Sequence, residues 1–147
     1  MREILFRGKR LDNGEWVEGF YCKHNMVQVC FSSDDPKTKH LIIQDGFCDW
    51  GFEPPLCGIE IDPETVGQFT GVIDKNDRKI FEGDVVCVVC RGIDEEDGNA
   101  VIVWDKETSR FIIEWKSIVS DFDSVYGHEC EVIGNIHDNP ELLEGGA

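Results

Sequence analysis

The sequence predicts a mostly β protein, because its apolar residues come in short runs separated by turn signals. The most punctuated stretch, Ile61 to Val86, predicts a strand, a turn, a second strand, a kink and a third strand. Near the start, Asn13-Gly14 separates two strand-like runs, which is a strong hairpin signal. Near the end, Glu131 to Ile136 reads as a closing strand.

The first hairpin is expected to join Glu3–Arg10 to Glu15–Tyr21. Its tight turn would place both Asn13 and Gly14 at positive φ. The rest of this half predicts a turn at Lys23-His24-Asn25, a strand at Met26–Phe31, a polar loop at Ser32–Lys39 and a short buried run at Leu41–Ile43.

The irregular stretch Asp45–Pro55 contains three aromatic residues, Phe47, Trp50 and Phe52, among glycines and adjacent prolines. Two interpretations remain open. The aromatic side chains fold back onto the core, as most large apolar side chains do, or they form a surface that contacts another protein. Under the second interpretation these three residues are the candidate contact site.

In the central stretch, Pro63 pushes Asp62 out of the helical region and predicts a turn. Asp74–Asp77 predicts a second turn, since Asn and Asp tolerate a left-handed backbone. Gly83-Asp84 predicts a bulge or kink before the apolar run that starts at Val85.

The last third begins with an acidic loop, Arg91–Asn99, and a hairpin that pairs Ala100–Trp104 with Phe111–Trp115. Trp104 and Trp115 are expected in the core. The spacing of Ile118, Val119 and Phe122 permits a short helix. A helical turn is expected at the end of the chain, with Asn139 as N-cap and Pro140 at the first helical position.

Three blocks carry a resemblance to a known family: REILFRGKRLDNGEWVEGF (2–20), ETVGQFTGVIDKNDRKIFEGDVV (64–86) and EVIGNIHDNPELLE (131–144). In this order they resemble the YopX family of bacteriophage and prophage proteins. The resemblance implies an all-β fold with a small SH3-like barrel, additional N-terminal hairpins and at most a short C-terminal helical turn. It also implies an uncharacterised phage accessory protein, and it supplies no active site.

Length predicts one domain over residues 1–147, with hairpins and the aromatic loop in 1–60 and a barrel-like core in 61–144. The net charge of −16 disfavours direct binding to nucleic acid or to an anionic membrane. Either the charge only solvates the protein, or an acidic face mimics nucleic acid or docks on a basic protein. With no signal peptide and no apolar run long enough to span a membrane, a cytoplasmic location in a bacterial host is expected.

The seven cysteines predict reduced, structural thiols. Cys87-x-x-Cys90 lacks the second pair of a zinc ribbon, and its strand-like context would point the two sulfur atoms to opposite faces. A metal site is a weaker alternative, built from residues whose spacing matches no standard pattern: Cys22, His24, Cys30, Cys48 and Cys57.

Two histidines near the end of the chain, His128 and His137, have acidic neighbours that permit an acid–base pair: Asp121, Asp123 and Asp138. In so acidic a chain, surface solvation explains such proximity equally well. The sequence contains no phosphate-binding loop and no nucleophile or metalloprotease motif.

These observations predict no catalytic, metal or cofactor-binding residue. The expected function is a non-catalytic protein-binding module or host modulator with an unidentified, basic protein partner. The alternatives are a structural protein that self-assembles through free sheet edges, as a homo-oligomer, and a metal-dependent enzyme.

Overall fold

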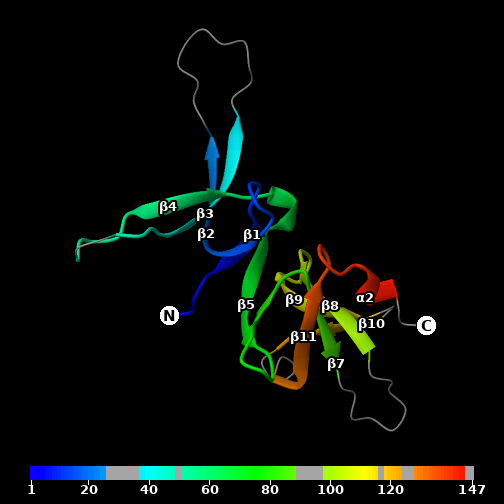
Figure 1. The fold of residues 1–147 in the computed structure, drawn as a ribbon. Helices are drawn as coiled ribbons and strands as arrows, with labels where there is room; N and C mark the ends of the chain where they lie inside the picture. Colours follow the sequence, from blue (N-terminus) through cyan, green and yellow to red (C-terminus); the bar gives the residue numbers. More distant parts are fainter. Residues whose placement is uncertain (26–36, 49–50, 89–97, 116–117, 124–127, 145–147) are drawn as a thin grey trace. The chain divides into compact units, whose positions relative to one another are not determined.

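A computed structural model describes residues 1–25, 37–48, 51–88, 98–115, 118–123 and 128–144 (Figure 1). The predicted all-β class is confirmed: the described strands pair into antiparallel sheets, and α2 (Glu141–Glu144) is a short helix near the C-terminus. The contacts divide the chain into an N-terminal unit, residues 4–67, and a C-terminal unit, residues 1–3 and 68–147. The single-domain expectation stays a prediction.

In the N-terminal unit the strands lie in the order β4-β3-β2-β1, and each is antiparallel to its neighbour. Ile42 on β3 and Ile61, just after β4, are almost completely buried. These two side chains therefore form much of the unit's apolar centre. The bounds are β1 (Phe6–Lys9), β2 (Trp16–Asn25), β3 (Thr38–Asp45) and β4 (Leu56–Glu60).

Backbone pairing also joins the ends of β1 and β4. Arg10 and Ile61 form an isolated antiparallel bridge, and the Asp62 N–H donates to the Lys9 carbonyl at 2.8 Å. The Ile61 side chain lies against Gly8, where an added Cβ would overlap it. The sheet therefore curls so that its first and last strands meet at one corner.

The hairpin between β1 and β2 is confirmed, but its predicted two-residue turn is wrong. Arg10 and Glu15 close a four-residue loop through an Arg10 N–H bond to the Glu15 carbonyl at 2.9 Å. Gly14 has a φ of 72°, whereas Asn13 is not among the described residues with positive φ. The Asn13 side chain instead accepts a hydrogen bond from the Glu15 N–H, which stabilises a wider loop.

Two further details of this unit differ from the prediction. The expected turn at residues 23–25 is wrong, because β2 continues to Asn25 and pairs there with Thr38 of β3. The predicted run Leu41–Ile43 is confirmed as part of β3, whereas β4 was not predicted. The predicted strand at 26–31 and most of the polar loop at 32–39 lie outside the described residues.

The C-terminal unit contains a hairpin of β5 (Gly67–Ile73, which begins at the unit boundary) and β6 (Lys79–Phe81), and a five-stranded antiparallel sheet in the order β10-β9-β8-β7-β11. Its core includes Val86, Ile102 and Val132. The remaining bounds are β7 (Asp84–Val88), β8 (Gly98–Asp105), β9 (Arg110–Trp115), β10 (Ile118–Asp121) and β11 (Cys130–Asn135).

The expected small barrel is found as an open sheet. Strand β11, the last strand of the chain, pairs with β7 at one edge of the sheet, and β10 pairs with β9 at the other edge. Among the described strands of this unit, no pairing between β10 and β11 closes the sheet.

The predicted order of the central stretch is confirmed. Asp62 caps η1 (Pro63–Thr65), a short 3₁₀ turn, through a 3.0 Å hydrogen bond from the Glu64 N–H. Asp77 has a φ of 61° in the next turn, and Gly83 has a φ of 84° at the kink before β7. These residues adopt the left-handed backbone that their types tolerate.

The hairpin of β8 and β9 is confirmed, whereas the expected place of Trp104 in the core is wrong. Trp104 is 38% exposed, while Trp115 packs partly buried against the core. Residues 118–121 form strand β10 rather than a helix, because they pair with β9. The predicted helical turn after Pro140 is confirmed as α2. Most of the acidic loop at 91–99 lies outside the described residues.

Candidate protein-contact site

One face of the N-terminal sheet carries apolar side chains that lie open to solvent. Phe20 of β2 lies opposite Ile43 of β3, which lies opposite Gly58 of β4, so these three residues share one face. Leu56, two residues before Gly58, is on the same face. Phe20 is 65% exposed and Leu56 is 76% exposed.

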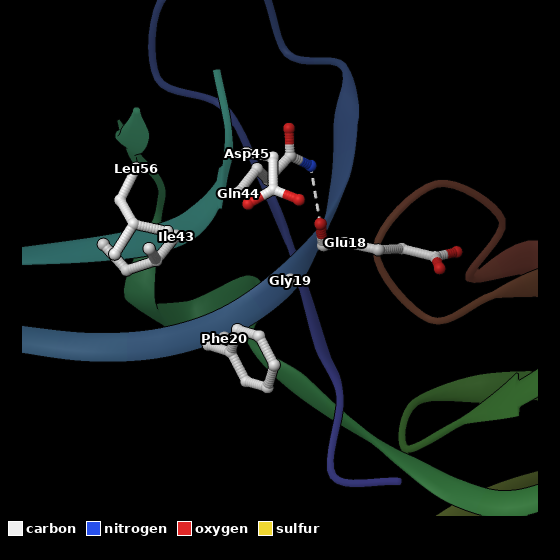
Figure 2. Close-up of a pocket in the computed structure, with 7 residues that line it drawn as sticks. All are labelled: Glu18, Gly19, Phe20, Ile43, Gln44, Asp45 and Leu56. Carbon is white, nitrogen blue, oxygen red and sulfur yellow. Dashed lines mark hydrogen bonds between the residues drawn. The ribbon is translucent and has the colours of Figure 1, made fainter. Parts of the chain in front are cut away.

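These residues surround a shallow pocket of about 270 Å³ (Figure 2). Its wall combines Phe20, Ile43 and Leu56 with the acidic residues Glu18 and Asp45. No basic side chain lines the pocket among the described residues. We call Phe20, Ile43, Leu56, Glu18 and Asp45 the contact surface.

The local sequence explains why this surface is held in place. Gly19 approaches β3 so closely that an added Cβ would overlap the Ile43 carbonyl oxygen, so a larger residue would push the strands apart. The Gln44 side chain donates a 2.5 Å hydrogen bond to the Glu18 carbonyl across the same two strands. The strands beneath the contact surface are therefore tightly joined.

The loop of residues 46–55, which we call the aromatic loop, connects β3 to β4 beside this surface. Its base is closed by a 2.6 Å hydrogen bond from the Gly46 N–H to the Pro55 carbonyl, next to the pair Asp45 and Leu56. Phe47 is 87% exposed and Phe52 is 74% exposed. Folding back onto the core is therefore wrong for both residues, and Trp50 lies outside the described residues.

The cysteines are spread over several elements. Cys22 lies on β2, Cys57 on β4 and Cys87 on β7, while Cys48 belongs to the aromatic loop. Cys30 and Cys90 lie outside the described residues, so the CxxC pair is described at Cys87 alone. The structure brings no three His, Cys, Asp or Glu side chains together as a metal site within its described ranges.

Cys130 differs from the other cysteines because it is completely buried on β11. Burial is the main cause that raises the pKa of its thiol to about 11, and the nearby Glu129 carboxylate adds to the effect. A thiol with so high a pKa is a poor nucleophile at neutral pH.

The candidate histidines are both exposed. His128 lies in a helical turn before β11, and His137 lies in the turn after it. The His137 N–H donates to the Asn135 side chain at 3.0 Å, a contact that fixes the turn. The acid–base pair with Asp121, Asp123 or Asp138 stays a prediction.

Sequence reasoning missed two buried carboxylates, Asp74 and Asp84. Asp74 accepts hydrogen bonds from the backbone N–H groups of Val132, Arg78 and Asn76 at 2.8–2.9 Å. Burial alone would raise the pKa of Asp74, but these three donors outweigh it and lower the pKa below 3.8. The turn position of Asp74 signalled two of these contacts, whereas the third depends on tertiary structure.

The pKa of Glu82 is shifted in the opposite direction to that of Asp74. The Glu82 side chain is partly buried, and this burial raises the pKa of its carboxyl above the ordinary 4.5. No pocket that we describe is lined by Glu82 or by either buried aspartate. These three groups therefore do not belong to the pocket of the contact surface.

Comparison with protein families gives a match to the YopX protein family over residues 5–144. The chain belongs to the YopX family. The match includes both units, and it confirms the resemblance seen in the three sequence blocks. A comparison with curated proteins found no match.

A solved structure gives a likeness of fold for this YopX family chain. The crystal structure of protein EF1440 from Enterococcus faecalis is 23% identical in sequence, with a TM-score of 0.50. The likeness covers 97% of this chain and 99% of that one. None of the described helices has both the length and the apolar character needed to cross a membrane.

Proposed function

We propose that this YopX family protein acts by binding another protein through its contact surface and aromatic loop, without catalysing a reaction. The observation that carries the proposal is the exposure of four large apolar side chains: Phe20 and Leu56 line the pocket, and Phe47 and Phe52 lie on the loop that joins β3 to β4. Exposed apolar patches on small proteins mark interaction sites more often than single exposed residues do.

The chemistry of the surface suggests the kind of partner. Aromatic side chains that become buried at an interface contribute much of its binding energy. Glu18 and Asp45 border the pocket, and the whole chain carries a charge of −16. A basic protein with apolar side chains beside its Lys or Arg residues would complement both features.

The setting that we propose follows the family. The protein is an accessory protein of a phage or prophage, and it meets its partner in the cytoplasm of the bacterial host. The open sheet of the C-terminal unit, in which β11 pairs back with β7, supports an SH3-like arrangement as a proposal for the fold.

The test compares variants that remove one exposed side chain each. Phe20→Thr and Leu56→Thr keep strand propensity while they remove the apolar groups at the pocket. Val119→Thr on β10 is the matched control, because Val119 is also exposed but belongs to the other unit. Folding of each variant is checked by urea unfolding before binding is measured.

Tagged protein is incubated with nuclease-treated bacterial lysate at ~150 mM and ~500 mM salt, where charge interactions are screened to different extents. Captured proteins are identified by mass spectrometry, and each one is then purified for titration. We expect one basic protein to bind the wild type and Val119→Thr, and to bind Phe20→Thr and Leu56→Thr at least ~10-fold more weakly, as for interface hot spots.

Equal affinity of all four proteins for the captured partner would overturn the proposal. So would an empty lane together with concentration-dependent self-association, which would favour the structural alternative. Enzymatic turnover, or tight DNA binding at ~150 mM salt, would also count against it.

A further inference from the structure

The outer edge of β4 adjoins the contact surface. Gly46 bonds to the Pro55 carbonyl at one end of the β3–β4 pairing, and the Ile61 N–H bonds to the His40 carbonyl at the other. Backbone groups alternate in direction along an antiparallel strand. The backbone N–H and C=O groups of residues 57 and 59 therefore point toward β3. Those of Leu56, Gly58 and Glu60 point outward, away from β3.

One of these outward groups already shows that the edge can bond to an additional segment. The Glu60 carbonyl accepts a 3.1 Å hydrogen bond from the Leu11 N–H, beside a pocket that Gly58 also lines. No described residue bonds to the outward groups of Leu56 and Gly58. Leu11 therefore occupies only the Glu60 end of the β4 edge, and the edge at Gly58 and Leu56 has no described hydrogen-bond partner.

We propose that the partner binds as an extended basic segment that adds a strand to β4 at Leu56 and Gly58. This inference rests on the proposed function and specifies how the same surface would be used. Main-chain hydrogen bonds to an exposed edge supply affinity in this mode of recognition, and alternate side chains supply specificity.

The side chains around this edge indicate which segment fits. The missing side chain at Gly58 leaves Leu41 and Ile43 within 3.5 Å of where its Cβ would be, so an apolar side chain of the added strand can approach them. Glu18 and Asp45 border the neighbouring pocket, which favours Lys or Arg in the same segment. Gly58, Asp45 and Glu18 share one face of the sheet, so the predicted ligand carries an apolar and a basic side chain two residues apart.

A second copy of this chain is a poorer occupant. Each copy carries a net charge of −16, and like charges brought together oppose association. In the C-terminal sheet, the edge strand β11 already has partners, because the Lys75 N–H donates to the Cys130 carbonyl and the Val132 N–H donates to the Asp74 carboxylate. The edge of β4 is therefore a better place for an external strand than the edge of β11.

The test uses the acetylated, amidated peptide Thr-Lys-Thr-Val-Thr-Lys-Thr as the probe, which places both lysines and the valine on one face of an extended strand. A twin peptide that is N-methylated at alternate residues keeps the charge and side chains but lacks the donors for one edge. Gly58→Pro removes an outward N–H, a change that edge strands tolerate, whereas Gly58→Ala adds a Cβ and keeps the N–H. Both variants are compared by urea unfolding and by NMR titration of ¹⁵N-labelled protein.

We expect the probe to shift the amide signals at Leu56 and Gly58 in the wild type. Binding to Gly58→Pro should be about fivefold weaker than binding to Gly58→Ala, as for one lost hydrogen bond, because both variants add a Cβ at this position and only the proline removes the N–H. The N-methylated twin should bind the wild type at least ~10-fold more weakly than the probe, because it loses more than one bond.

Equal affinity of the probe and its N-methylated twin would overturn the proposal, as would shifts that avoid β4 or no shift at ~1 mM probe. Dimerisation of the wild type that Gly58→Pro abolishes would assign the edge to a second copy instead. If Phe20→Thr still weakens binding to the captured partner while Gly58→Pro does not, only the edge-strand inference fails and the proposed function stands.

Discussion

At the scale of single residues, Asp74 links two segments that are far apart in the sequence. Its carboxylate holds the turn at residues 74–78 through Asn76 and Arg78, and it also binds the Val132 N–H on β11. The Arg78 side chain adds a 3.2 Å bond to the Val132 carbonyl. One buried aspartate therefore stabilises both a turn and the edge of a sheet.

Asp74→Asn should lower the free energy of unfolding by about 2–3 kcal/mol at pH 7, because the amide nitrogen cannot accept from a buried N–H. Urea unfolding measures the change. Asp77→Asn is the control, since Asp77 is exposed and asparagine tolerates its φ of 61°. Equal stability of the two variants would contradict this role for Asp74.

The same residue predicts a pH dependence. The pKa of Asp74 is lower in the folded protein than the ordinary 3.8, so the folded state favours the charged carboxylate. Its contribution to stability is therefore complete above about pH 4 and is lost as the pH falls through the lower, folded pKa. Wild-type protein should lose more stability than Asp74→Asn between pH 5 and pH 3, in urea melts that share one buffer series. Parallel curves would contradict the prediction.

The thiols should differ strongly in reactivity. Cys130 is buried and has a pKa of about 11, whereas Cys57 is exposed on β4. At pH 8 only about one Cys130 in 1,000 would be thiolate, from the difference between pKa and pH. Iodoacetamide should label Cys57 at least ~100-fold faster than Cys130, as measured by peptide mass spectrometry at short times. Comparable rates would show that β11 opens readily.

At the scale of elements, close contact between β2 and β3 depends on a residue without a side chain. A Cβ added at Gly19 would overlap the Ile43 carbonyl oxygen and would lie 2.8 Å from Cγ2 of Ile42. Gly19→Ala should therefore lower stability by about 1–3 kcal/mol through overpacking. In urea unfolding, Gly58→Ala should change stability less, because its nearest contact is 3.3 Å from Leu41. The opposite ranking would refute this explanation.

The elements that the sequence predicted best are those defined by local chemistry. The turn capped by Asp62, the left-handed residue Asp77 and the kink at Gly83 lie where their residue types predict. The prediction failed where pairing decided the outcome. Residues 23–25 extend β2 because β3 lies beside them, and β10 is a strand because it pairs with β9.

At the scale of the whole molecule, charge is the dominant property. A net charge of −16 on 147 residues creates repulsion that opposes the compact state. Raising NaCl from ~20 mM to ~500 mM shortens the Debye length to a few ångströms and should raise the melting temperature. Sucrose at equal osmolality is a control for general exclusion effects, and a melting temperature that rises only with sucrose would refute the charge explanation.

The candidate site was partly visible in the sequence. Phe47 and Phe52 were singled out because they lie in an irregular loop, and the structure places both in solvent. Phe20 and Leu56 were missed, although they line the pocket of the contact surface. Phe20 lies in a run with only partial alternation, and β4 itself was unpredicted, so no periodicity assigned these side chains to the open face.

The sequence alone determined the β class, the turns at Asp62, Asp77 and Gly83, and the family, because each depends on local residue chemistry or on ordered sequence blocks. Only the tertiary structure decided which face of β2, β3 and β4 stays open, where Asp74 finds its third donor, and which sheet edge is uncovered. Those features depend on strand register, which pairs residues that are distant in the chain. Register is set by the packing of whole strands against one another, so it cannot be deduced from any short stretch of sequence.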